Sequence, residues 1–161
     1  MLTKKSKLID LILETLNNEI ASLTLSAKAA HEAATHEESK AEDSHDTRGL
    51  EASYLAGAQQ ARIQSLMKVI TFFQLLKIRN FQPTDPVSIG ACIDLKLDGK
   101  IVTYFLASHG GGISVSIEGK PVQVITPLAP LGEALLDKFV GDSVEVESRN
   151  INREYEIILI W

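Results

Sequence analysis

Residues 8–76 carry a hydrophobic repeat with the period of an α-helix. Apolar or small side chains recur every three or four residues, so they share one helical face. The repeat stops between Glu38 and Gly49, where turn-forming residues are frequent. The sequence therefore predicts an antiparallel hairpin of two long helices over residues 1–80. The expected contact positions are Leu8, Ile12, Leu16, Ile20, Leu23, Ala27, Ala30 and Ala34, then Leu50, Tyr54, Ala58, Ala61, Ile63, Leu66, Ile70, Phe73 and Leu76.

Two prolines, Pro83 and Pro86, should end the second helix before Asn80, because proline cannot continue a helix. Beyond them the hydrophobic period changes to two, which is typical of β-strands. Residues 81–161 are therefore expected to form a small antiparallel sheet with one helix, and the whole chain to be of the α+β class. The expected strands are residues 91–97, 100–107, 113–117, 122–126, 144–147 and 155–160, and the expected helix is 130–138.

Two of these strand pairs should be hairpins. Asp98-Gly99 supplies the positive φ angles of a tight two-residue turn, and Glu118-Gly119-Lys120 separates the second pair. The three glycines after His109 are expected to form another flexible hairpin connection rather than a phosphate or oxyanion loop, since no Gly-Lys-Ser/Thr or Gly-x-Ser-x-Gly motif accompanies them.

The composition narrows the class of protein. No stretch of apolar residues is long enough for a transmembrane helix, and the amphipathic N-terminal segment does not resemble a signal peptide. The single cysteine, Cys92, cannot form an internal disulfide and is expected to be buried in a cytoplasmic protein. The net charge of −5 argues against free DNA or RNA as the main partner.

The charges of the predicted hairpin are unevenly distributed. Residues 32–51 hold seven acids and two bases, whereas the rest of residues 1–82 holds eight bases and three acids. An acidic tip on a basic stalk is suited to placing carboxylates near a cation. His31 and His36 are five residues apart and do not share a helical face, so a zinc-protease helix is not predicted. Binding of a transition metal by His31, His36 and His45 stays an alternative to a solvated helix end.

Three motifs in the second half occur in a tight order. They are Pro130-Leu131-Gly132-x-Ala134-Leu135-Leu136, Val140-Gly141-Asp142-x-Val144-x-Val146 and Arg153-Glu154-Tyr155-Glu156-Ile157. Together they make residues 85–160 resemble the FKBP-like C-terminal domain of the bacterial Gre transcript cleavage factors. The resemblance implies docking at the rim of the RNA polymerase secondary channel, with Pro130, Leu131 and Gly132 at the contact. Prolyl isomerase activity is not expected, because the domain has too few aromatic residues for such a pocket.

The Gre resemblance also extends to the hairpin. Gre hairpins carry an acid-x-x-Glu pair at the tip, followed by Asn-Ala-Glu-Tyr, and here Ala52, Tyr54 and Gln59-Gln60 match. Alignment on Tyr54 places Thr47 and Leu50 where the two acids belong. The acids nearby are Asp43, Asp46 and Glu51. The resemblance implies that these three lie near the catalytic Mg²⁺ of the polymerase, with a register shifted by one residue.

The expected function follows from this resemblance. The chain would bind the RNA polymerase core and lie near the RNA 3′ end. It would either stimulate the polymerase's own cleavage of backtracked RNA or modulate elongation, pausing or initiation. The shifted acids favour modulation. It would not itself be an enzyme and would hold no cofactor or metal of its own. The alternative is an adaptor protein of a different class, in which the coiled coil forms a dimer and the FKBP-like module binds another partner.

Overall fold

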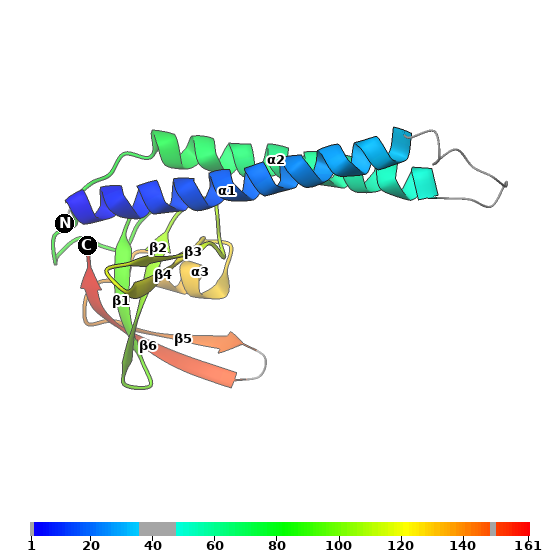
Figure 1. Cartoon of the computed structure of the whole chain (residues 1–161). Helices are drawn as coiled ribbons and strands as arrows, with labels where there is room; N and C mark the ends of the chain where they lie inside the picture. Colours follow the sequence, from blue (N-terminus) through cyan, green and yellow to red (C-terminus); the bar gives the residue numbers. More distant parts are fainter. Residues whose placement is uncertain (1, 36–47, 149–150) are drawn as a thin grey trace. The chain divides into compact units, whose positions relative to one another are not determined.

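A computed structural model describes residues 2–35, 48–148 and 151–161 (Figure 1). Two long helices are followed by six strands with one short helix between the fourth and fifth strands, which confirms the α+β class. Two compact units are present, one of Met1–Ile12 with Phe72–Trp161 and the other of Leu13–Thr71. No helix of the described residues combines the length and apolarity needed to cross a membrane. The elements are α1 (Leu2–Thr35), α2 (Arg48–Leu75), β1 (Cys92–Leu97), β2 (Lys100–Leu106), β3 (Ser114–Ile117), β4 (Lys120–Ile125), α3 (Pro130–Leu135), β5 (Ser143–Ser148) and β6 (Ile151–Ile160).

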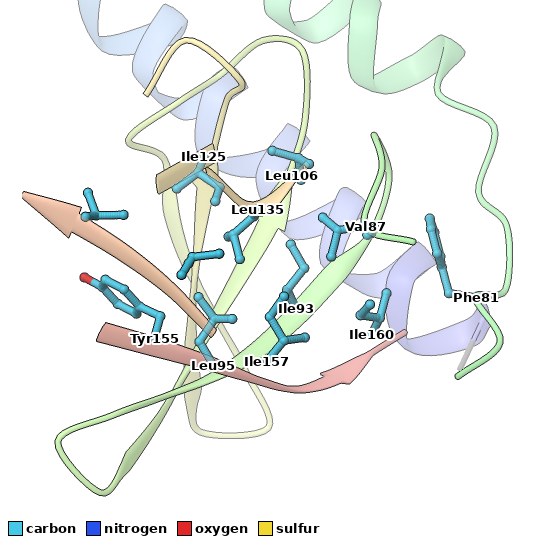
Figure 2. Packing of buried hydrophobic residues seen from close by; sticks show 13 residues of the cluster. Phe81, Val87, Ile93, Leu95, Leu106, Ile125, Leu135, Tyr155, Ile157 and Ile160 are labelled. Atoms are coloured by element: carbon cyan, nitrogen blue, oxygen red, sulfur yellow. The ribbon is translucent and has the colours of Figure 1, made fainter. Parts of the chain in front are cut away.

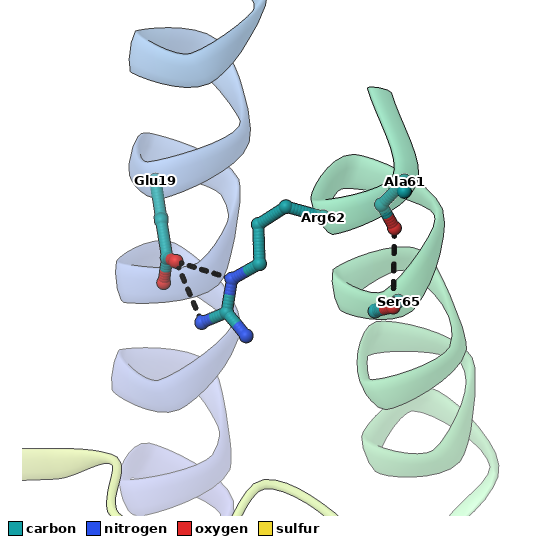
Figure 3. Close-up of polar contacts among 4 residues, drawn as sticks. All are labelled: Glu19, Ala61, Arg62 and Ser65. Atoms are coloured by element: carbon teal, nitrogen blue, oxygen red, sulfur yellow. Dashed lines mark hydrogen bonds and ion pairs between the residues drawn. The ribbon is translucent and has the colours of Figure 1, made fainter. Parts of the chain in front are cut away.

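The helices α1 and α2 run side by side as the predicted hairpin (Figure 1). Along α1 the predicted contact face is confirmed, since Leu8, Ile12 and Leu16 are buried and the later positions up to Ala30 are half-buried. A polar contact also joins the two helices. Arg62 donates from Nε and Nη2 to Glu19 Oε1 at 3.2 and 2.8 Å (Figure 3). Both side chains are solvent-exposed, so this pair stabilises the hairpin by no more than about 1 kcal/mol.

The predicted contact face of α2 is wrong in its first half. Leu50 and Tyr54 are 56% and 70% exposed, and Ala58 and Ala61 are exposed as well. Ala56 and Gln59 are half-buried in their place, whereas the predicted positions of the second half are confirmed as buried or half-buried: Ile63, Leu66, Ile70 and Phe73. This set also repeats every three or four residues, and it is the one that includes the large side chains of the second half. Alanines occur on several faces of the first half of α2. Their pattern therefore does not show which of these faces contacts α1. The helix ends at Leu75, before Asn80 as predicted.

The six strands form one sheet in the order β3-β4-β2-β1-β6-β5. Four of the neighbouring pairs are antiparallel, but β2 and β4 are parallel, so the prediction of a purely antiparallel sheet is wrong. The parallel pair arises because β3 lies outside β4 at the edge of the sheet, and β4 returns beside β2. Strand periodicity gives the existence of each strand but not its neighbour, which is why this pair was missed.

Both predicted tight turns are confirmed. Asp98 and Gly99 have φ angles of 49° and 76°, and Glu118 and Gly119 have 52° and 76°. Two successive positive φ angles match the twist of the strands on either side. The glycine segment after His109 is not a hairpin connection as predicted, because the strands on its two sides, β2 and β3, are not paired with each other.

The core of the strand-bearing unit lies against one face of the sheet (Figure 2). Leu135 of α3 is fully buried there, as are Ile93 and Leu95 of β1 and Leu106 of β2. Because α3 contributes a fully buried leucine to this core, its position on the sheet is fixed by packing. The remaining core residues are Phe81, Val87, Ala91, Ile125, Val144, Val146, Tyr155, Ile157 and Ile160.

A buried lysine anchors the first turns of α1 within this unit. Lys5 is 1% exposed, and its ammonium group donates to the carbonyl oxygens of Arg79 and Gly90, both at 3.0 Å. The same nitrogen lies 4.3 Å from the ring centre of Phe81, a cation–π distance. The pKa of Lys5 is lowered from 10.5 to about 8, mainly by burial; the nearby Cys92 opposes this shift and the charge of Arg79 adds to it. Sequence reasoning missed Lys5, since lysine is almost never buried unless it is paired.

We expect the contribution of Lys5 to stability to increase with pH. Above pH 8 folded Lys5 loses its proton, whereas the unfolded chain keeps it up to about pH 10.5, so the unfolded state binds more protons in this interval. The difference in unfolding free energy between the wild type and Lys5→Met should therefore widen by on the order of 2 kcal/mol between pH 7 and pH 10. Urea unfolding at both pH values measures it.

The comparison is best made in a Cys92→Ala background, which removes the titration of the thiol. Lys7→Met removes the same charge from an exposed position of α1 and serves as the matched control. If the unfolding free energy of the protein with Lys5, minus that of Lys5→Met, stays constant or decreases from pH 7 to pH 10, the lowered pKa of Lys5 is contradicted.

Candidate functional site

Residues 126–132 lead into α3 and include its first turn; we call them the docking turn because the sequence analysis predicts the polymerase contact there. The backbone N–H of Ala129 donates to the carbonyl oxygen of Thr126 at 2.9 Å, and the N–H of Glu133 donates to Ala129 at 2.9 Å. Pro130 opens the helix, where its missing N–H has no partner to lose. Of the residues predicted at the polymerase contact, Pro130 is exposed, Leu131 is half-buried and Gly132 is buried.

Gly132 holds the first turn of α3 close to the backbone of Thr126. A Cβ atom at this position would lie 2.0 Å from the carbonyl oxygen of Thr126 and 2.7 Å from its carbonyl carbon. Such contacts are with backbone atoms, so no side-chain rotation can relieve them. Glycine is therefore required at residue 132 for packing, and its place in the Pro-Leu-Gly motif has a structural reason independent of any partner.

Leu128 is the most exposed large apolar residue among those described, at 93%. It lies between Pro127 and Pro130 at the apex of the docking turn. Sequence reasoning missed it, because a single leucine in a loop has no periodic signal. The one feature of the sequence that could have indicated Leu128 is its position between two prolines, which restrict the backbone on either side.

The other end of α3 is also held by the backbone. Asp137 adopts a φ of 60°, and its N–H donates to the carbonyl oxygen of Val87 at 3.0 Å. The N–H of Val87 in turn donates to Lys138 at 2.8 Å. Asp142 of the Val-Gly-Asp motif accepts from the N–H of Phe139 at 2.8 Å, which closes the following turn. The docking turn and α3 are thus fixed at both ends.

Of the three acids predicted near the polymerase Mg²⁺, only Glu51 lies within the described residues. Asp43 and Asp46 lie outside the described residues, as do His36 and His45. Glu51 lies exposed in the first turn of α2, where a negative charge favours the helix. His31 lies exposed near the end of α1. Within the described part of the chain, no three histidine, cysteine or acidic residues are grouped as metal ligands.

Cys92 is buried, as predicted. Burial raises the pKa of its thiol to about 12, so the thiolate that a nucleophile requires is not formed near neutral pH. The opposing effect of the Lys5 ammonium is smaller than that of burial. The surroundings of Cys92 therefore do not favour nucleophilic chemistry.

Comparison with known protein families identifies the strand-bearing half. Residues 82–161 match the family model of the transcription elongation factor GreA/GreB C-terminal domain. This half of the chain belongs to that family, and the docking turn, α3 and the Val-Gly-Asp motif lie within the match. The chain is therefore a Gre-family homologue. A comparison with curated proteins found no significant match.

Solved structures of Gre factors are also similar to this chain. The GreA factor homolog 1 (Gfh1) of Thermus thermophilus is 18% identical with a TM-score of 0.38, covering 92% of this chain and 94% of that one. A structure of the transcription factor Gfh1 is 22% identical with a TM-score of 0.41, covering 94% and 92%. The elongation factor GreA/GreB from Nitrosomonas europaea is 17% identical with a TM-score of 0.38, covering 64% and 90%.

We expect Gly132→Ala to destabilise the strand-bearing unit by about 2–4 kcal/mol, because the new Cβ atom meets the Thr126 backbone. Urea unfolding followed by the fluorescence of Trp161, which belongs to the same unit, measures this loss.

Gly57→Ala is the matched control. Gly57 lies within α2, and a Cβ atom added there would meet no other described part of the chain within 4 Å. Alanine favours a helix over glycine by about 0.5–1 kcal/mol, so this variant should be stabilised when followed by helical circular dichroism. An unchanged stability of Gly132→Ala would contradict the packing role of Gly132.

Proposed function

We propose that this chain is a transcription factor that binds the RNA polymerase core through its docking turn. The observation that carries the proposal is the family match over residues 82–161, which includes Pro130, Leu131 and Gly132. The geometry supports it, because the turn is exposed at Pro130 while the backbone beneath it is held by hydrogen bonds and by close packing at Gly132. A pre-formed surface of this kind binds with little ordering cost.

In this proposal the hairpin enters the secondary channel of the polymerase. Asp43, Asp46 and Glu51 then lie near the catalytic Mg²⁺ and the RNA 3′ end. Carboxylates of this kind would hold a second Mg²⁺, which would supply Lewis-acid activation of a water molecule. Mg²⁺ takes oxygen ligands in a near-octahedral shell, commonly one or two carboxylates with water. Glu51, exposed at the start of α2, is the described member of this set.

The register of the acids favours modulation of elongation, pausing or initiation over cleavage of backtracked RNA. A shift of one residue at a helix start turns a side chain by about 100° around the helix axis. Carboxylates displaced in this way occupy the channel without completing the metal shell. The reaction centre would in either case be that of the polymerase, and the chain would act as its accessory factor.

Binding and cleavage are tested separately with purified core polymerase. The wild type and the triple variant Asp43→Ala, Asp46→Ala, Glu51→Ala should bind the polymerase equally, whereas Pro130→Ala should bind at least several-fold more weakly. Stalled elongation complexes then report shortening of the backtracked transcript. With saturating wild-type protein we expect little shortening but an altered rate of elongation, and the triple variant should lose this effect. Absence of binding by the wild type would refute the proposed function.

A second candidate function is favoured by the exposed apolar side chains on the hairpin. Leu50, Tyr54 and Leu55 of α2 and Leu25 of α1 are each more than half exposed. In a coiled-coil adaptor these side chains would be covered by a second copy of the chain. Such a dimer would bury the surface that must enter the polymerase channel.

Sedimentation velocity distinguishes the two candidates. Channel binding predicts a monomer at micromolar concentrations, with the same sedimentation coefficient for wild type and Tyr54→Ser. A dimer that dissociates in Tyr54→Ser would instead support the adaptor.

A further inference from the structure

The apex of the docking turn presents a single large apolar side chain to solvent. Leu128 is 93% exposed, although the α3 residue Leu135 behind the turn is fully buried. An isolated exposed leucine on a protein surface needs no special explanation. What distinguishes Leu128 is the rigid backbone that carries it and the residues that surround it in the turn.

The backbone on both sides of Leu128 is restricted. Pro127 and Pro130 have φ fixed by their rings. The hydrogen bond from the N–H of Ala129 to Thr126 closes the turn at 2.9 Å. Gly132, in the first turn of α3, also packs closely against the same Thr126 carbonyl. A backbone held in this way loses little conformational freedom when a partner covers the turn.

The turn also lacks charge. Its seven residues are Thr126, Pro127, Leu128, Ala129, Pro130, Leu131 and Gly132. None of them bears a cation that would pair with a phosphate, so the turn is not suited to nucleic acid. Its chemistry fits an apolar pocket on a protein, in the way that buried apolar anchors dominate protein interfaces.

We propose that Leu128 is the apolar anchor of the docking turn and inserts into an apolar pocket on the surface of RNA polymerase. This inference rests on the proposed function and adds to it the residue and the kind of contact that give the docking its affinity. In this proposal Pro130 restricts the backbone of the turn, Gly132 allows its close packing on Thr126, and Leu128 contacts the polymerase. Because the contact is apolar, salt does not screen it as it screens a contact between charges.

The experiment titrates full-length protein against fluorescently labelled core polymerase at low and at high salt. Leu128→Ala should raise the Kd about tenfold or more, by the same factor at both salt concentrations. Leu128→Met keeps an apolar side chain of similar size and should stay within about threefold of wild type. Leu75→Ala is the matched control, since Leu75 is also largely exposed, at 75%, but lies at the end of α2.

Thermal unfolding of each variant shows that the fold is intact, and Leu128→Ala should leave the midpoint nearly unchanged because the side chain is so exposed. If the wild type binds and Leu128→Ala binds equally well, the anchor is refuted while polymerase binding stands. An equal loss in Leu75→Ala also refutes a specific role for Leu128. If the wild type itself does not bind, the proposed function fails and the anchor fails with it.

Discussion

The buried ammonium group of Lys5 connects three separate segments of the strand-bearing unit. Its two carbonyl partners belong to Arg79, after the end of α2, and to Gly90, just before β1. Taking a charged amine out of water is costly, so these oxygens and the Phe81 ring are needed to compensate it. The first turns of α1 are therefore part of this unit, although they are far from the strands in sequence.

Lys4 connects the first turn of α1 to the C-terminal residue Trp161 and to Glu118. Its ammonium group lies 5.0 Å from the ring centre of Trp161 and 3.1 Å from a carboxylate oxygen of Glu118. The backbone of Trp161 pairs with that of Cys92, which ties the C-terminal residue to the start of β1. The two lysines thus bring the N-terminal helix, the linker and the C-terminus together around β1.

How far the sequence predicts this structure depends on the range of the interaction. Local signals were reliable: Asp98-Gly99 specified its turn through backbone angles, and Pro130 marked the helix start. The parallel pairing of β2 with β4 was not predictable in the same way, because it depends on where β3 lies in the finished sheet. Lys5 was missed for a related reason, since its carbonyl partners are distant in sequence. In the candidate site, the motif pointed to Pro130 and Gly132, but the exposure of Leu128 depends on how the folded turn is packed.

The corrected contact face of α2 changes how the start of that helix is understood. With Ala56, Gln59 and Ile63 turned inward, Tyr54 faces solvent instead of packing on α1. Glu51 precedes Tyr54 by three residues, a spacing that places the two on the same side of a helix. Tyr54 therefore contributes little to the hairpin core, and both Tyr54 and Glu51 are exposed to solvent.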